Sequence, residues 1–308
     1  MGANRCWHRR AFQGSSPGVT IITDPRCTAY HKPGHPERPN RVARTLDLLR
    51  LQKTLPLQWA EPAEVTDAQI LRAHTPEHLR RLAQPGDFDG DTPAHPGIDQ
   101  HARRSVGGAI RAMALARSGE TAFSLMRPPG HHATRALAMG FCYLGSMAIA
   151  VLEARALGVE RVAVLDFDVH HGNGTEDILA GQPGTTFVSV HQHPAYPGTG
   201  AVDVGGNCFN FPVGPGTPRA AWRQVYEAAF ERLVAARPQL VGVSAGFDAY
   251  SKDPLANGTL ERDDFLWLGK RLRALGVPVF AVLEGGYSLD LPDLVFHFLL
   301  GLDGREAT

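Results

Sequence analysis

The chain reads Arg161-Val162-Ala163-Val164-Leu165-Asp166-Phe167-Asp168-Val169-His170-His171 near its middle. The first part, 161–167, is an apolar run with β-branched residues, which predicts a buried strand of a parallel sheet. Asp168 and His170 follow, two residues apart. Residues two apart in an extended segment point to the same side, so a carboxylate oxygen and an imidazole nitrogen can face one metal ion. This stretch therefore predicts a strand of an α/β fold with a metal site at its carboxyl end.

A second motif supplies a third ligand. Gly246-Phe247-Asp248 follows 240–244, another predicted strand, so Asp248 can complete the set from a neighbouring strand end. Three protein ligands, with a fourth position left to water or substrate, are typical of catalytic rather than structural zinc. Because carboxylate oxygens also suit ferrous iron, Zn²⁺ is the expected metal and Fe²⁺ the alternative.

The rest of the chain alternates between strand and helix patterns. Apolar runs predict strands at 18–23, 121–126, 161–167, 185–191, 240–244 and 277–283. Helices are expected at 36–53, 67–82, 100–118, 143–157, 218–236 and 260–275, and long surface loops at 84–98 and 193–217. This alternation predicts a mostly parallel sheet, whose sites lie at the carboxyl ends of the strands. No domain boundary is evident, so we expect one domain over 18–308 and a disordered N-terminal segment over 1–17.

Composition excludes several other classes of protein. Lys plus Arg and Asp plus Glu are balanced at 31 each among 308 residues, so we expect no direct nucleic-acid partner. The four cysteines show no CxxC spacing, which favours a reducing compartment. No apolar stretch approaches the ~20 residues of a membrane span, and no secretory signal is evident. We therefore expect a cytoplasmic protein without a membrane partner.

Two further motifs suggest catalytic groups. His131 and His132 follow the predicted strand 121–126 and could be paired acid and base groups, provided that partners such as Asp166 and Asn173 fix their tautomers. An isolated His-His pair is otherwise simply two solvated loop residues. Glu284-Gly285-Gly286-Tyr287 follows the last strand, and a tyrosine hydroxyl there could stabilise an oxyanion, which is worth about 2.7–4 kcal/mol per donor.

Together these motifs resemble the zinc-dependent histone deacetylase family, particularly its class II branch and the similar bacterial amidohydrolases. The resemblance runs from about residue 24 to about residue 300. It is carried by Gly34-His35-Pro36-Glu37-Arg38-Pro39, 127–132, Gly140-Phe141-Cys142, 166–175, 244–248 and 284–287. Asn173 and Glu284 stand where the class I pattern has an aspartate and a glycine, which favours class II.

The resemblance implies a three-layer αβα, arginase/deacetylase-like fold with a central, mostly parallel sheet of about eight strands. It implies three zinc ligands, Asp168, His170 and Asp248. His132 would be the main general base and acid, oriented by Asn173. His131, oriented by Asp166, would assist electrostatically, and Tyr287 would polarise the acyl carbonyl.

The resemblance also bears on further metal ions. A structural K⁺ would be held by Asp166, Ser189 and nearby backbone carbonyls. Arginases use two metals, but Gly172 and Tyr250 stand where the second metal needs acidic ligands, so one catalytic metal is expected.

The substrate follows from the channel that the resemblance implies. Phe141, beside Gly140, and Tyr196 would flank the alkyl stem of an acylated lysine in a peptide or protein, or of another small acylated amine. Leu255 stands at the position where polyamine-specific relatives carry an acidic gatekeeper.

Two alternatives to a lysine deacylase remain open. Assembly into a homo-oligomer is also compatible with the sequence. Asp87, Asp89 and Asp91 in the loop 84–98 keep an acetylpolyamine deacetylase as the second interpretation, although a solvated Asp-Gly turn also explains them. The other is an inactive member of the family that binds acylated ligands or acts as a scaffold. An inactive member would be expected to lack a metal ligand, the histidine pair or the tyrosine, and all of these residues are present in the sequence.

Overall fold

The computed structural model describes residues 18–306. The predicted N-terminal segment, 1–17, lies outside the described residues, as do 307–308. Eight strands form one sheet in the order β2-β1-β3-β8-β7-β4-β5-β6, and every neighbouring pair is parallel. The predicted mostly parallel sheet of about eight strands is thus confirmed. The strands are β1 Val19–Ile22, β2 Leu57–Ala60, β3 Thr121–Ser124, β4 Val162–Asp166, β5 Thr185–Gln192, β6 Cys208–Val213, β7 Leu240–Ala245 and β8 Val279–Leu283.

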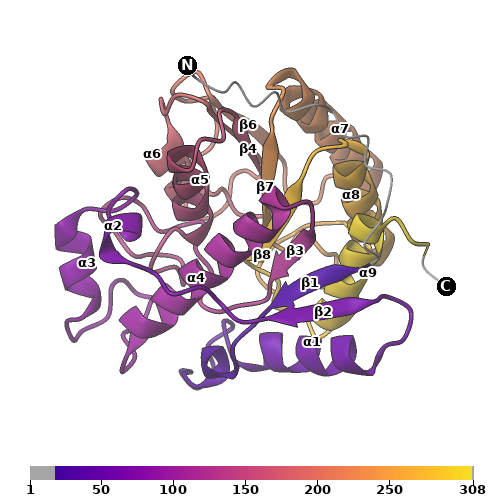
Figure 1. Cartoon of the computed structure of the whole chain (residues 1–308). Helices are drawn as coiled ribbons and strands as arrows, with labels where there is room; N and C mark the ends of the chain where they lie inside the picture. Colours follow the sequence, from indigo (N-terminus) through magenta and orange to yellow (C-terminus); the bar gives the residue numbers. More distant parts are fainter. Residues whose placement is uncertain (1–17, 307–308) are drawn as a thin grey trace, which may run out of the picture.

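Helices cover both faces of the sheet, which gives the three predicted layers (Figure 1). On one face lie α1 Asn40–Leu51, α7 Arg219–Ala235, α8 Arg262–Ala274 and α9 Leu291–Asp303. On the other lie α2 Asp67–Ile70, α3 Pro76–Leu82, α4 Ile98–Arg117, α5 Ser146–Ala156 and α6 Asn173–Leu179. A short 3₁₀ helix, Pro25–Thr28, follows β1. No helix within residues 18–306 is long and apolar enough to cross a membrane.

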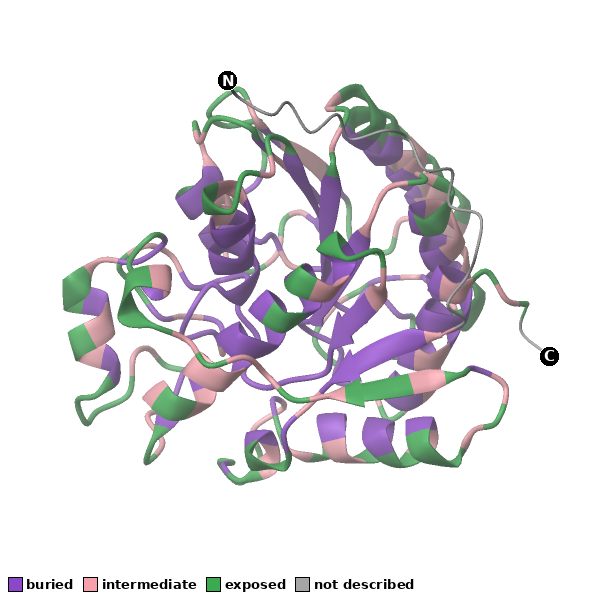
Figure 2. Cartoon of the chain, viewed as in Figure 1, coloured by how far each residue is buried: buried purple, intermediate pink, exposed green. Residues whose placement is uncertain are grey.

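The two layers of helices bury two separate apolar cores. In β4, Ala163 and Leu165 belong to one core and Val162 and Val164 to the other, because successive side chains of a strand point to opposite faces. The central strands are therefore buried on both sides, as Figure 2 shows. This double burial explains why β4, β7 and β8 are continuous apolar runs in the sequence.

Several predicted boundaries were wrong. The sequence did not predict the two edge strands. β6 lies inside the expected loop 193–217, and both edge strands are partly exposed, so neither is a continuous apolar run. The expected helix 67–82 is two helices, because Thr75 caps the second one and Pro76 begins it. Helices α6 and α9 were not predicted either.

Candidate active site

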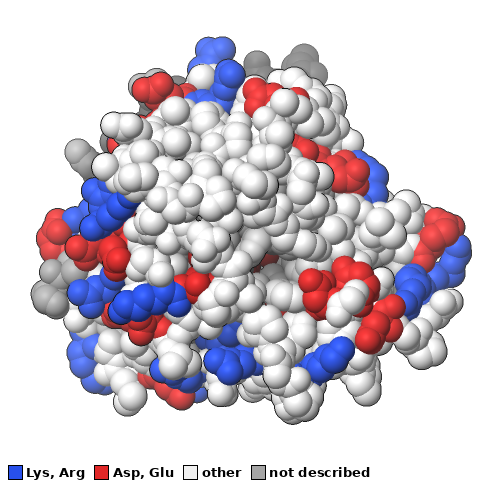
Figure 3. Space-filling model, turned by 180° about the vertical axis from the view of Figure 1, so that it is seen from behind, with Lys and Arg blue, Asp and Glu red and all other residues white. Residues whose placement is uncertain are grey.

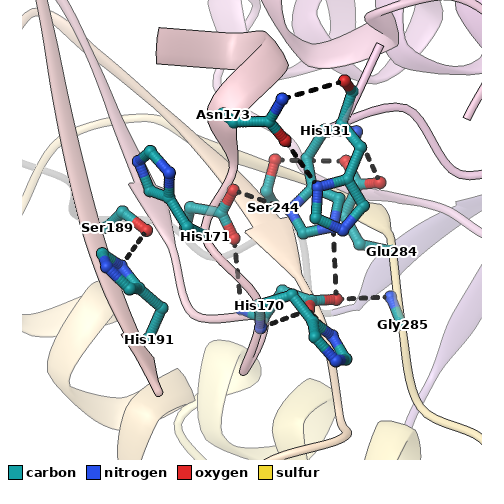
Figure 4. A network of polar contacts seen from close by, with 12 residues as sticks. His131, His170, His171, Asn173, Ser189, His191, Ser244, Glu284 and Gly285 are labelled. Atoms are coloured by element: carbon teal, nitrogen blue, oxygen red, sulfur yellow. Dashed lines mark hydrogen bonds and ion pairs between the residues drawn. The ribbon is translucent and has the colours of Figure 1, made fainter. Parts of the chain in front are cut away.

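The carboxyl ends of four central strands meet at one edge of the sheet. Asp166 at the end of β4 is in register with Ser244 of β7, and Ala245 is in register with Leu283 of β8. The segments that follow these strands carry the predicted metal ligands and Tyr287, and the segment after β3 carries the histidine pair. The order of the strands, rather than closeness in the sequence, therefore assembles the site (Figure 4).

The three residues predicted as metal ligands lie together. His170 Nδ1 is 3.2 Å from Asp168 Oδ1 and 3.1 Å from Asp248 Oδ2. One potential ligand atom of each residue lies within 4.8 Å of the other two, and both carboxylates are fully buried. Two ligand atoms of a tetrahedral zinc with bonds of about 2.0–2.2 Å are about 3.3–3.6 Å apart. The spacing and the donor set thus fit one small cation.

The charges of the two carboxylates also favour a bound cation. Burial raises the pKa of Asp248, and the negative charge of Asp168 raises it further. Two buried carboxylates beside each other resist being ionised together unless a positive charge lies close to both. Without a metal, His170 supplies that charge, because the two carboxylates, against the effect of burial, raise its pKa well above the usual value. A bound divalent cation would take its place.

Backbone amides hold the two carboxylates in place. Asp168 Oδ1 accepts a hydrogen bond from His170 N at 2.9 Å, and Asp168 Oδ2 accepts one from Gly285 N at 2.7 Å. Asp248 Oδ1 accepts one from Val169 N at 2.8 Å. A Cβ atom at Gly285 would lie 2.1 Å from Asp248 Oδ2, so only glycine allows the backbone to approach the carboxylates this closely.

His131 is held in a strongly acidic environment. Its Nδ1 donates to Asp166 Oδ2 at 3.1 Å, and its Nε2 is 3.8 Å from Asp168 Oδ2. Burial alone would lower the pKa of His131, but the charges of Asp168 and Asp166 raise it to about 10. With the charges of the protein alone, His131 is therefore a cation.

His132 has the opposite character. Its ring lies beside that of His131, with the centroids 4.0 Å apart. Burial lowers the pKa of His132 well below its usual value, and the positive charges of His131 and His170 add to that effect. Nδ1 donates to Asn173 Oδ1 at 2.7 Å, which leaves Nε2 of the neutral ring free to accept a proton. Asp166 and Asn173 thus contact the histidines that they were predicted to orient.

Tyr287 is buried, and Arg41 contacts both its ring and its backbone segment. The Arg41 guanidinium carbon lies 4.7 Å from the centre of its ring, and Arg41 Nε donates to the Gly286 carbonyl at 2.7 Å. Burial raises the pKa of Tyr287 well above its usual value, so the hydroxyl keeps its proton at neutral pH. It can serve as a hydrogen-bond donor.

Three of the predicted channel residues, Phe141, Tyr196 and Gly140, lie beside these groups. The Phe141 ring is 5.8 Å from the Tyr287 ring, and the Tyr196 ring is 5.0 Å from the His132 ring. Glycine at position 140 allows the backbone to lie against His132 and Tyr196, because a Cβ atom there would lie 2.5 Å from His132 Cδ2 and 2.9 Å from Tyr196 Cε1. Leu255 is 40% exposed.

The acidic loop lies beside the channel walls. His35 Nε2 donates to the Asp91 carbonyl at 2.9 Å, while its Nδ1 accepts the Glu37 amide at 3.1 Å, and its ring contacts Phe141. Burial raises the pKa of Tyr196, and the charges of Asp91 and Asp89 raise it further. Figure 3 shows acidic side chains gathered near a hollow on one face of the molecule.

The predicted potassium ligands lie on neighbouring strands. Asp166 of β4 is in register with Ser189 of β5. Ser189 Oγ also contacts His191 Nδ1 at 2.8 Å (Figure 4).

The sequence did not assign a role to Glu284 or Glu37. Glu284 Oε2 accepts the amides of Gly130 and His131 at 2.7 and 3.1 Å, so it fixes the segment that carries the histidine pair. Glu37 forms a bidentate pair with the fully buried Arg127, at 2.5 and 2.7 Å. In the sequence, the only signal for either residue was an acidic side chain inside one of the quoted motifs.

This geometry agrees with the comparison to known proteins. The family description "Histone deacetylase domain" matches residues 35–299. The chain belongs to the histone deacetylase family. The predicted family is thus confirmed, and membership implies a metal-dependent deacetylase, consistent with the candidate metal site.

Relatives within the histone deacetylase family span most of the chain. A probable deacetylase of Methanothermobacter thermautotrophicus is 38% identical over 307 residues, which cover 94% of this chain and 92% of the relative. A histone deacetylase-like amidohydrolase of Pseudomonas aeruginosa is 38% identical over 306 residues, which cover 92% and 79%. The crystal structure of an acetylpolyamine aminohydrolase from Burkholderia pseudomallei matches with a TM-score of 0.85 at 29% identity and covers 92% of this chain and 98% of that chain. The predicted fold is confirmed as well.

Proposed function

We propose that the chain is a zinc-dependent amidohydrolase that removes acetyl or other acyl groups from lysine side chains or similar amines. The observation that carries this proposal is the placement of His132. Its Nδ1 is bonded to Asn173 Oδ1, which leaves Nε2 free, and its ring lies beside both the ligand His170, at 6.1 Å between centroids, and Tyr196, at 5.0 Å. This is the placement that a general base for water attack requires.

The residues would act in sequence. Asp168, His170 and Asp248 would hold the zinc ion, which would supply a Lewis acid for the acyl carbonyl and lower the pKa of a water molecule. His132 Nε2 takes a proton from that water as the water oxygen bonds to the carbonyl carbon. The Tyr287 hydroxyl donates a hydrogen bond to the carbonyl oxygen, where negative charge develops. When the C–N bond breaks, His132 returns the proton to the leaving nitrogen, and the products are the carboxylic acid and the free amine.

His131 and the second ion have supporting roles in this proposal. His131, which is bonded to Asp166 and lies beside the ring of His132, would assist electrostatically. Asp166 and Ser189, with nearby backbone carbonyls, would hold a K⁺ ion that fixes the end of β4. We assign Fe²⁺ as the alternative to zinc, since two of the three ligands are oxygens.

An acetylpolyamine is the second candidate substrate. The negative charges of Asp89 and Asp91 help to raise the pKa of Tyr196, and these carboxylates would attract a second ammonium group of a polyamine. Leu255 argues for acyl-lysine instead, because it brings no charge to the rim.

The experiment is turnover of a panel by the zinc-loaded protein, with the Tyr287→Phe variant as control. The panel holds acetylated and longer-acylated lysine peptides, acetylputrescine and acetylspermidine. We expect lysine peptides to be hydrolysed and the variant to be strongly impaired. Preferred turnover of polyamines would select the second candidate. If no compound is hydrolysed although zinc is bound, the hydrolase proposal is wrong and an inactive acyl-binding protein is favoured.

A further inference from the structure

A buried carboxylate outside the reacting groups holds the tyrosine segment. Asp253 lies between β7 and α8 and is 6% exposed. Asp253 Oδ2 accepts hydrogen bonds from Tyr287 N at 2.6 Å and Ser288 N at 3.1 Å. Asp253 Oδ1 accepts one from Leu255 N at 3.0 Å. Its partners are thus three backbone amides, and two of them belong to the segment that carries the Tyr287 hydroxyl.

These contacts are favourable only if both carboxylate oxygens act as acceptors. Burial raises the pKa of Asp253, and the three amide hydrogen bonds oppose the rise because they favour the charged form. Without Asp253, the buried amide of Tyr287 would lose its hydrogen-bond partner, which destabilises this conformation of the segment. The segment would then relax away from its present position.

The other side of the same segment is held by Arg41. Arg41 Nε donates to the Gly286 carbonyl at 2.7 Å, and its guanidinium lies over the Tyr287 ring. Arg41 therefore restrains the ring and one carbonyl, whereas Asp253 restrains the amide nitrogens of Tyr287 and Ser288. Neither restraint replaces the other, because a peptide segment held at one side can still rotate about it.

We infer that Asp253 is a positioning residue that fixes the Tyr287 hydroxyl and joins its segment to the backbone of Leu255. This inference rests on the proposed role of Tyr287. Asp253 touches no reacting atom, so its positioning effect passes through Tyr287. Its negative charge also helps to raise the pKa of Asp248, and zinc content is therefore measured on each variant. A displacement of about 1 Å in a reacting group costs up to about 10²-fold in rate.

The variant Asp253→Asn tests the hydrogen bonds of Asp253 without changing the size of the side chain. The side chains have nearly the same shape, but the amide has only one acceptor oxygen. If the NH₂ group of the asparagine faces Tyr287 N and Ser288 N, hydrogen-bond donors face one another and both bonds are lost. If the amide is turned round, the bond to Leu255 N is lost instead. Asp290→Asn is the matched control. The Asp290 carboxylate accepts a hydrogen bond from Tyr250 Oη at 2.9 Å and lies near Lys252, but it does not bind the backbone of the Tyr287 segment.

The test is a double-mutant cycle with Asp253→Asn and Tyr287→Phe, with kcat and KM measured on the substrate with the highest turnover in the panel. We expect Asp253→Asn to lower kcat by about 10–100-fold with KM nearly unchanged. In the Tyr287→Phe background it should lower kcat no further, because there is no hydroxyl left to position. Asp290→Asn should match the parent protein.

The outcomes separate this inference from the proposed function. If Tyr287→Phe keeps the parent kcat, the proposed function fails first. If Tyr287→Phe is impaired but Asp253→Asn is not, the positioning role is wrong. If Asp253→Asn lowers kcat equally in both backgrounds, its effect is general destabilisation, which also overturns the inference.

A second measurement needs no variant and covers the case in which Asp253→Asn does not fold. Amide hydrogen exchange of the parent protein should show slow exchange at Tyr287 and Ser288, although neither lies in a helix or strand. Leu289, which is 64% exposed, is the internal reference. Exchange at Tyr287 as fast as at Leu289 would overturn the inference.

Discussion

Replacing Tyr287 with phenylalanine removes one oxygen atom and leaves the packing intact. The ring contacts Phe141 and lies under the Arg41 guanidinium, and neither contact involves the hydroxyl. Tyr287 N is bonded by Asp253, and that bond is also independent of the side chain. We therefore expect Tyr287→Phe to fold like the parent protein and to bind zinc equally well.

The expected loss follows from the role of the hydroxyl. It donates to the carbonyl oxygen mainly when negative charge develops there, so its removal weakens the transition state more than substrate binding. A donor of this kind is worth about 2.7–4 kcal/mol, which corresponds to about 10²–10³ in kcat. KM should change little.

The assay is steady-state hydrolysis of an acetyl-lysine peptide, with zinc content measured on the same samples. Calorimetric binding of a hydroxamate, which chelates a zinc ion at the end of a channel, reports whether the site is still open. A variant that keeps its zinc and the parent kcat would refute the oxyanion role of Tyr287. A large rise in KM at constant kcat would show instead that the hydroxyl only binds substrate.

Three further predictions concern other parts of the molecule. Asp248→Ala should release the metal, since it removes one of three ligands, and full zinc stoichiometry by metal analysis would contradict the ligand assignment. His35→Ala should raise KM by about threefold to tenfold, the worth of one hydrogen bond, with kcat nearly unchanged, because His35 holds the Asp91 loop and Phe141 rather than the reacting groups. His35→Gln can keep a donor to Asp91 and should restore much of the loss, whereas equal kcat losses in both variants would argue against a role at the rim. Acid should destabilise the fold through His74, whose pKa is lowered by burial and by His78 to about 3. Above about pH 6.5 His74 is neutral in both states. Between about pH 6.5 and 3 only the unfolded state binds the proton, so the free energy of unfolding falls by up to about 1.4 kcal/mol per pH unit. Urea unfolding at several pH values should show a shallower fall for His74→Gln, and an unchanged slope would be evidence against this explanation.

The sequence predicted the central part of the fold well, for a physical reason. β4 and β7 are buried on both faces, so burial itself requires an apolar run that a sequence pattern reveals. The edge strand β2 is half-exposed and carries Gln58 and Trp59, so the same pattern is absent. Its position depends on pairing with β1, which the local sequence does not encode.

Some residues of the site could be predicted from the sequence and others could not. Asp168 and His170 are predictable because their spacing in an extended segment carries the chemistry. The roles of Glu284 and Asp253 are not predictable in this way, because both act by accepting backbone amides from segments far away in the sequence. A backbone amide has no sequence signature, so only the structure shows which carboxylate accepts it.

The central claim is that one zinc ion held by Asp168, His170 and Asp248 is needed for amide hydrolysis. The most direct measurement is turnover of an acetyl-lysine peptide after removal of metal with a chelator and stepwise return of zinc. The account predicts that turnover is lost on removal and recovers fully at one zinc per chain, with no recovery in Asp248→Ala. Undiminished turnover by the stripped protein, or recovery in Asp248→Ala, would contradict it.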